Sequence, residues 1–293
     1  MIPACITFLL FILAAILAGA VLVYPLELLL HDVISIPYHK LITHTTLLCG
    51  LVASALYLKR YRLLTRTTLG YGPRCNLFTR KILLGFGAGL LIIFVVEVCL
   101  LCLGVHASAL VPGWQTIMNT AIKALLAGMV VGFIEETIFR GALLGGLLQQ
   151  TNTLVAVTLS SLVYAAVHFI KYRALGPETE LHWYTGLEML PKALFRFSDP
   201  VIIDTFATLF VFGVLLALIR IRNNHIAWCI GIHAGVVAAI SLVRNFTNPV
   251  PGSGYSFLVN DYNNLLGWLT FFWLTLITVI YFRQGTKSTH AGA

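Results

Sequence analysis

Five side chains that can carry a charge or a proton stand within apolar stretches of the sequence. The segment "GFIEETIFRG" holds Glu135, Glu136 and Arg140, "YAAVHF" holds His168, and "GIHAG" holds His233. A carboxylate and two imidazoles around one point are the usual parts for activating water: the carboxylate takes a proton, and the imidazoles orient the water or stabilise an oxyanion. The same trio suits a divalent metal such as zinc with an open position. The residue types alone leave both alternatives open.

Helix geometry separates the two glutamates. Glu136 and Arg140 are four residues apart, about 40° around an α-helix, and can therefore pair. Glu135 is five residues from Arg140, about 140° around the axis, and must point elsewhere. We expect Glu136 to be a structural glutamate that is neutralised by its own helix. Glu135 is then the working carboxylate, available to a partner on another helix.

The spacing along the chain indicates that partner. Glu135 lies 16 residues before Thr151, the middle of a tight connection between two apolar spans, and His168 lies 17 residues after it. In an antiparallel helix pair these two positions lie at nearly the same depth. His233 is only eight residues into its own span and agrees less well with a depth count. We therefore expect spans that extend beyond the membrane, or one that is broken.

The composition identifies the class of protein that must position these groups. The 293 residues are 59% hydrophobic and only 10% charged, and the mean hydropathy is +0.91, whereas soluble domains carry about 25% charged residues. Ionisable groups at membrane depth usually face the interior of a helix bundle and mark a functional site. The sequence predicts an all-α, polytopic membrane protein with about eight transmembrane helices that enclose an intramembrane site.

The candidate spans are apolar runs whose lengths suit helices rather than the strands of a barrel. No interval between them is long enough for a soluble core, so we expect one membrane domain over residues 1–293, with an uncleaved first span. Two intervals rich in Pro, Asn and Gly, 172–199 and 244–263, are expected to be irregular surface loops. The spans are 2–24, 41–58, 82–105, 117–148, 153–171, 200–219, 226–243 and 264–282.

The net charge of +8 is explained by membrane topology. A basic loop over residues 59–81 is typical of the cytoplasmic side, and eight spans then place both termini in the cytoplasm. The lipid bilayer is the partner that this loop indicates, and nothing else in the sequence favours nucleic acid. In a bacterium such a multi-pass protein would lie in the plasma (inner) membrane. The basic residues of the loop are Lys59, Arg60, Arg62, Arg66, Arg74, Arg80 and Lys81.

Three short motifs resemble those of the CPBP family, the CAAX-protease and bacteriocin-processing (Abi) intramembrane peptidases. "EETIFR" (Glu135–Arg140) matches the family's E-E-x-x-x-R completely. "YAAVH" matches F-x-x-x-H with Tyr164 in place of Phe, and "HAGVV" matches H-x-x-x-N with Val237 in place of Asn. The resemblance covers roughly residues 115–245, which we take as the catalytic-motif core.

The resemblance implies a membrane-embedded endopeptidase, similar to type 2 CAAX prenyl proteases, that hydrolyses a peptide bond near the membrane surface. It implies that Glu135 activates the water, that His168 assists, and that His233 helps to stabilise the tetrahedral oxyanion. Glu136 and Arg140 would hold the geometry of the site. The implied substrates are membrane-associated proteins or peptides, or proteins with a C-terminal tail.

The departure at Val237 and the choice of mechanism remain open at this stage. Valine cannot donate the hydrogen bond of the family's asparagine, and losing one oxyanion donor costs on the order of 10²–10³ in rate. A glutamate-type mechanism requires no cofactor, whereas a metal-assisted one would place a divalent ion such as zinc on Glu135, His168 and His233. The competing functions are a proton-coupled transporter, since buried Glu, His and Arg also build proton relays, and a non-catalytic immunity or scaffold protein on the same fold.

Overall fold

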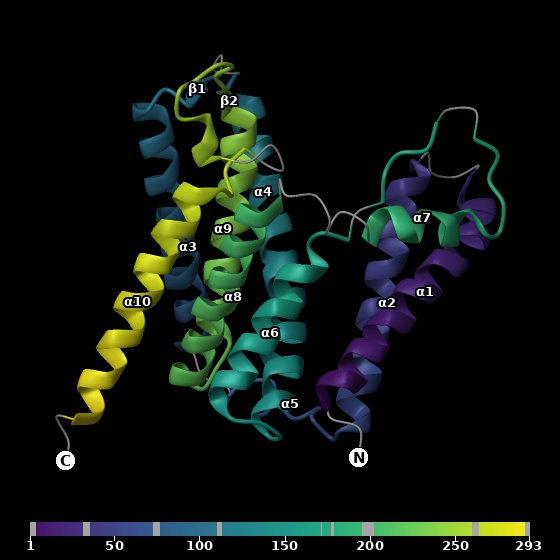
Figure 1. The fold of residues 1–293 in the computed structure, drawn as a ribbon, viewed down its shortest axis with the longest axis horizontal. Helices are drawn as coiled ribbons and strands as arrows, with labels where there is room; N and C mark the ends of the chain where they lie inside the picture. Colours follow the sequence, from purple (N-terminus) through teal and green to yellow (C-terminus); the bar gives the residue numbers. More distant parts are fainter. Residues whose placement is uncertain are drawn as a thin grey trace.

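The computed structural model is built almost entirely of helices (Figure 1). It describes residues 4–31, 36–72, 77–109, 113–170, 172–176, 179–194, 202–259 and 264–290. The elements in chain order are α1 (Ala4–Leu30), α2 (Tyr38–Arg60), α3 (Leu77–Cys102), β1 (His106–Ser108), α4 (Trp114–Glu136), η1 (Thr137–Leu143), α5 (Leu144–Leu148), α6 (Thr153–Val167), α7 (Thr185–Leu194), α8 (Ile203–Asn223), α9 (Ala227–Phe246), β2 (Thr247–Pro249), η4 (Ser256–Leu258) and α10 (Trp268–His290).

The membrane class predicted from the sequence is confirmed. Within the described part of the chain, six helical segments are long and apolar enough to cross a membrane, so the predicted number of eight is not confirmed. The predicted span 153–171 ends early, because α6 is a shorter apolar helix of 15 residues. The six segments are Ile6–Leu30, Tyr38–Arg60, Leu77–Cys102, Trp114–Leu148, Ile203–Asn223 and Ala227–Phe246.

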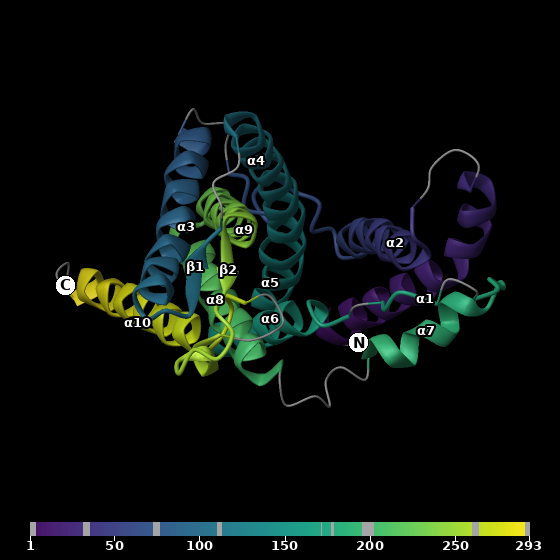
Figure 2. The ribbon, with the colours of Figure 1, turned by 90° about the horizontal axis from the view of Figure 1, so that it is seen from above.

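Helix α9 lies between α3 and α4, and glycines bring the three backbones together (Figures 1 and 2). A Cβ added at Gly89 of α3 or at Gly235 of α9 would overlap the backbone of the facing helix. On the other side, a Cβ at Gly132 of α4 would lie 2.9 Å from the carbonyl oxygen of Ile230. Small residues allow this approach between membrane helices. Because Gly132 is three residues before Glu135, the same contact sets the glutamates beside α9.

The α1–α2 hairpin lies beside the other helices and contacts them at η1 and α5, and α7 crosses the hairpin (Figures 1 and 2). Met189, Leu190 and Ala193 of α7 are buried against the hairpin. The prediction of an irregular loop over 172–199 is therefore wrong for residues 185–194. The reason is that the apolar residues of this segment recur at helical spacing. Burying this face against the hairpin stabilises the helix even though it contains Pro191.

The second predicted loop, 244–263, is partly regular. Helix α9 continues to Phe246, and β2 then pairs with β1 in an antiparallel two-stranded sheet. At the base of this sheet, the buried His106 faces two acceptors. Its Nδ1 lies 2.8 Å from a carboxylate oxygen of Glu97, and its Nε2 lies 2.9 Å from the carbonyl oxygen of Asn264. These contacts tie α3 and the chain before α10 to the end of α9.

Candidate active site

The helix that carries the glutamates changes its winding directly after them. Helix α4 ends at Glu136, and η1 is a π-helical stretch that leads into α5. Such π-helical turns are frequent at functional sites. The Thr137 hydroxyl donates to the carbonyl oxygen of Phe133 and also contacts the hydroxyl of Tyr71, which lies within the basic loop. The regular α-helical geometry assumed from the sequence therefore holds only up to Glu136.

Glu136 is fully buried and joins two of the other candidate residues. Its Oε1 accepts a hydrogen bond from Arg140 Nη1 at 3.0 Å and one from His233 Nδ1 at 2.7 Å. The pair with Arg140 was expected from the spacing, and it forms despite the π-helical turn. The contact with His233 was missed, because the two residues are 97 positions apart in the sequence. Glu136 thus holds both the guanidinium of Arg140 and the imidazole of His233 in position.

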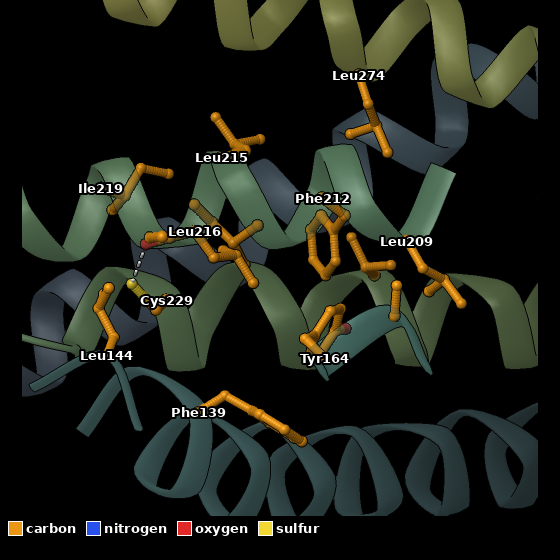
Figure 3. Close-up of a cluster of buried hydrophobic side chains, with 14 of the residues drawn as sticks. Phe139, Leu144, Tyr164, Leu209, Phe212, Leu215, Leu216, Ile219, Cys229 and Leu274 are labelled. Carbon is orange, nitrogen blue, oxygen red and sulfur yellow. Dashed lines mark hydrogen bonds between the residues drawn. The ribbon is translucent and has the colours of Figure 1, made fainter. Parts of the chain in front are cut away.

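Arg140 is held by two further contacts. Its Nη2 donates to the carbonyl oxygen of Gly213 on α8 at 3.3 Å, and its guanidinium carbon lies 4.3 Å from the centre of the Tyr164 ring. A cation over an aromatic face is attracted by the ring quadrupole, and the attraction grows when water is excluded. Tyr164 is itself buried between Phe139 and Phe212 (Figure 3). The arginine therefore connects α8, α6 and η1.

His168 is the residue directly after the last turn of α6, and its ring orientation is fixed. Its Nδ1 lies 2.7 Å from the carbonyl oxygen of Tyr164, and the two rings stack edge to face at 4.6 Å. A carbonyl oxygen can only accept, so Nδ1 carries the proton of that bond. In the neutral form of the ring, Nε2 is then the accepting nitrogen, and it faces Glu135.

Glu135 faces the two histidines together. Its Oε2 lies 3.7 Å from His168 Nε2 and 3.8 Å from His233 Nε2, too far for direct hydrogen bonds. This oxygen is buried and has no hydrogen-bond partner among the described residues. The side chains of Glu135 and His168 are 26% and 25% exposed, whereas that of His233 is 3% exposed. The trio is therefore reachable from one side and closed on the other.

The fit of this trio to a metal ion can be judged from the same distances. Two ligands on a tetrahedral zinc, each at about 2.0–2.1 Å, lie about 3.3 Å apart. The observed separations are wider, and among the described residues no group of three His, Cys, Asp or Glu side chains is arranged to hold a metal. As arranged, these three residues do not form a ligand set for a metal ion.

Val237 lies one turn after His233 and faces a cavity beside the site. The cavity has a volume of about 200 Å³, and Tyr164, His168 and His233 also line it. A larger cavity of about 570 Å³ lies against α7 and is lined by none of the site residues named above. The smaller one is therefore the cavity that belongs to the candidate site.

The comparison with known proteins agrees with the motifs. Residues 117–239 match the model of one protein family, described as type II CAAX prenyl endopeptidase Rce1-like. This segment contains all three motifs, and the resemblance to the CPBP family is confirmed over it. The match supports a membrane-embedded peptidase of the CAAX type in general. No curated protein and no solved structure matches the chain.

Proposed function

We propose, on the premise that residues 117–239 resemble type II CAAX prenyl endopeptidases, that the chain hydrolyses a peptide bond with a water activated by Glu135. One observation carries the proposal: the buried Oε2 of Glu135 faces the Nε2 atoms of both histidines at 3.7 and 3.8 Å. A single water that makes hydrogen bonds of about 2.8–3.0 Å spans separations of this size. The substrates are membrane-associated or C-terminally tailed proteins and peptides.

In the proposed mechanism Glu135 and His168 act on the water. Nε2 of neutral His168 accepts one hydrogen bond from the water and orients it, while the carboxylate of Glu135 takes its other proton. The water oxygen then attacks the peptide carbonyl carbon to form a tetrahedral oxyanion. When the carbon–nitrogen bond breaks, the proton held by Glu135 passes to the leaving amine. The products are a carboxylic acid and an amine, and the carboxylate of Glu135 is restored.

His233 is placed to stabilise the oxyanion. Its Nδ1 already donates to the carboxylate of Glu136 at 2.7 Å. A ring that donates from both nitrogens is an imidazolium, so Nε2 can donate to the oxyanion when the ring carries its second proton. This role compensates in part for Val237, which has no donor.

The site lies near the end of the molecule that carries the basic loop. Tyr71, within that loop, contacts Thr137, two residues from Glu135. The carbonyl oxygen of Gly70 in the same segment accepts a hydrogen bond from the backbone of Ile226 at the α8–α9 turn. If basic loops face the cytoplasm, the scissile bond lies close to the cytoplasmic surface, and both termini lie on that side.

The proposal is tested by Glu135→Gln in proteoliposomes. A library of quenched fluorescent peptides, each anchored by an apolar C-terminal tail, is incubated with wild type and variant, and the products are read by mass spectrometry. General-base catalysis contributes about 10²–10⁴-fold, so we expect cleavage to fall by that factor. Glu188→Gln on α7, an exposed carboxylate, is the matched control and should cleave like wild type. Undiminished cleavage by Glu135→Gln would refute the assignment.

A further inference from the structure

Three basic side chains meet where α3, α8 and α9 come together, at the end of the bundle opposite the β1–β2 sheet (Figure 1). Arg220 is in the last turn of α8, His225 is in the turn between α8 and α9, and Lys81 is in the second turn of α3. Lys81 Nζ lies 2.5 Å from His225 Nε2. Arg220 Nη1 donates to the side chain of Asn224, the residue before His225, at 3.4 Å. We call Lys81, Arg220 and His225 the basic cluster.

No carboxylate balances the basic cluster within the part of the chain that the structure describes. None of the ion pairs found there includes Lys81, Arg220 or His225. Arg220 is only 8% exposed, and a buried charge without a counter-ion is unfavourable. Burial, and then the charges of Lys81 and Arg220, lower the pKa of His225 from its ordinary value. A negative charge bound here would offset both the repulsion and the burial.

Two N–H donors of the basic cluster are shielded from water and have no acceptor among the described residues. When charged Lys81 donates to His225 Nε2, the proton of the neutral ring lies on Nδ1. That Nδ1 and the Nε of Arg220 are both buried atoms without a hydrogen-bond partner. A buried donor that makes no hydrogen bond destabilises the protein. The oxygens of an anion would supply the acceptors.

The start of α9 adds to the positive potential beside the basic cluster. This helix of 20 residues begins at Ala227, and its N-cap residue, Ile226, makes no side-chain capping bond. The backbone N–H of Ile226 donates to the carbonyl oxygen of Gly70, which fixes the start of the helix against the basic loop. The first N–H groups of a helix and its dipole favour an anion. Helix and side chains therefore favour the same kind of ligand.

The position of the basic cluster along the helices matches the depth of lipid phosphates. Helix α3 has 26 residues, which is about 39 Å at 1.5 Å per residue. The hydrocarbon core is about 30 Å thick, and the bilayer with its headgroups is about 40–45 Å thick. The first turns of α3 therefore reach the headgroup layer. Lys81 and His225 are half-buried there, so a headgroup can reach them from the surface.

We propose that Lys81, Arg220 and His225 form a binding site for one anionic phosphate group, such as that of a phosphatidylglycerol headgroup. Basic pockets between transmembrane helices bind phosphate-bearing headgroups in this way. The site differs from the general attraction of a basic loop to an anionic surface, because it holds a single phosphate at a defined position. It is also independent of the proposed peptidase function, since none of the three residues belongs to the candidate active site.

The test counts bound lipid by native mass spectrometry of the full chain in phosphatidylcholine micelles that are titrated with phosphatidylglycerol. Wild type should retain one phosphatidylglycerol per chain in preference to phosphatidylcholine. Lys81→Gln should weaken this binding by about 10–100-fold, the loss expected for one hydrogen bond to a charged group. Arg80→Gln is the matched control, because this neighbouring exposed residue loses the same charge and should bind like wild type.

A second pair of variants tests Arg220 without changing any charge. Gly70 has φ +80°, and a Cβ there would overlap Arg220 Nε. Gly72 has φ +60°, and a Cβ there would meet nothing within 4 Å. Both alanines are strained by the positive φ, but only Gly70→Ala displaces the guanidinium. Gly70→Ala should therefore weaken phosphatidylglycerol binding, and Gly72→Ala should not.

A further arm separates a lipid headgroup from free phosphate, which offers the same chemistry. The melting temperature is measured in phosphatidylcholine micelles with and without excess inorganic phosphate. Retention of phosphatidylglycerol without a response to inorganic phosphate identifies a headgroup, the reverse identifies free phosphate, and a response to both supports the shared phosphate chemistry. A response to neither refutes the site.

Two results of the variant pairs would also overturn the proposal. Equal weakening by Lys81→Gln and Arg80→Gln would indicate diffuse attraction rather than a site. Wild-type binding by both Lys81→Gln and Gly70→Ala would exclude the basic cluster as the place of binding. Because peptide cleavage is not the readout, either result leaves the proposed peptidase function standing.

Discussion

Replacing Glu136 by glutamine would leave a buried arginine without its counter-ion. The Glu136 side chain is 0% exposed and that of Arg140 is 3% exposed, with 3.0 Å between Oε1 and Nη1. The amide keeps the shape and still accepts from His233, so the main loss is the charge. Arg140 would keep neutral acceptors, the amide oxygen and the carbonyl of Gly213, and the ring of Tyr164, but it would have no counter-ion. Breaking a buried ion pair in this way destabilises by about 3–5 kcal/mol.

A double-mutant cycle isolates this ion pair. Arg140→Met alone removes the counter-ion of Glu136 and leaves a buried carboxylate. The double variant Glu136→Gln with Arg140→Met removes both charges. The double variant should therefore lose less free energy of unfolding than the sum of the two single variants, by about 1–3 kcal/mol. The free energy is measured by denaturant titration in mixed micelles, with Glu188→Gln as a control expected within about 0.5 kcal/mol of wild type. Additive single effects would contradict the buried pair.

Two further predictions concern α8 and its neighbours. A Cβ at Gly213 would lie 3.0 Å from Cβ of Ser161, so Gly213→Ala should push α6 aside and lower kcat/KM by about 10–100-fold; Gly87→Ala, with nothing within 4 Å, should not. Burial and the neighbouring Lys81 lower the pKa of His225 from its ordinary 6.5. The unfolded chain then binds more protons below about pH 6.5, so the melting temperature should fall as the pH is lowered, and His225→Gln should flatten that fall. A melting temperature that rises on acidification to the same extent in both proteins would contradict this.

Much of the candidate site is predictable from local spacing. The four-residue step from Glu136 to Arg140 indicates an ion pair in any α-helix, and the pair forms at 3.0 Å. The matched distances of Glu135 and His168 from the connection at Thr151 indicate similar depth, and the structure brings their side chains to 3.7 Å. These inferences succeed because long apolar runs form helices, and the regular geometry of a helix determines the distances between residues at a given spacing.

Other features of the fold and the site depend on contacts between residues far apart in the sequence, which local spacing does not predict. The π-helical turn η1 starts where Tyr71 contacts Thr137, and a Cβ at Gly141 would approach Leu69, so a distant loop shapes the winding. The hydrogen bond between Glu136 and His233 likewise joins different helices. Helix α7 was missed because Pro191 and the charged residues of the helix suggest a loop, although its apolar face packs against the α1–α2 hairpin.

The central claim is that Glu135 and the two histidines share one water. The most direct measurement is an electron density map of the wild-type protein in lipid at a resolution that shows ordered solvent. We predict a water within about 3 Å of Glu135 Oε2 that also lies within hydrogen-bond distance of the Nε2 atoms of both His168 and His233. A map in which the two imidazoles turn away from Glu135, with no solvent shared between them, would contradict the account.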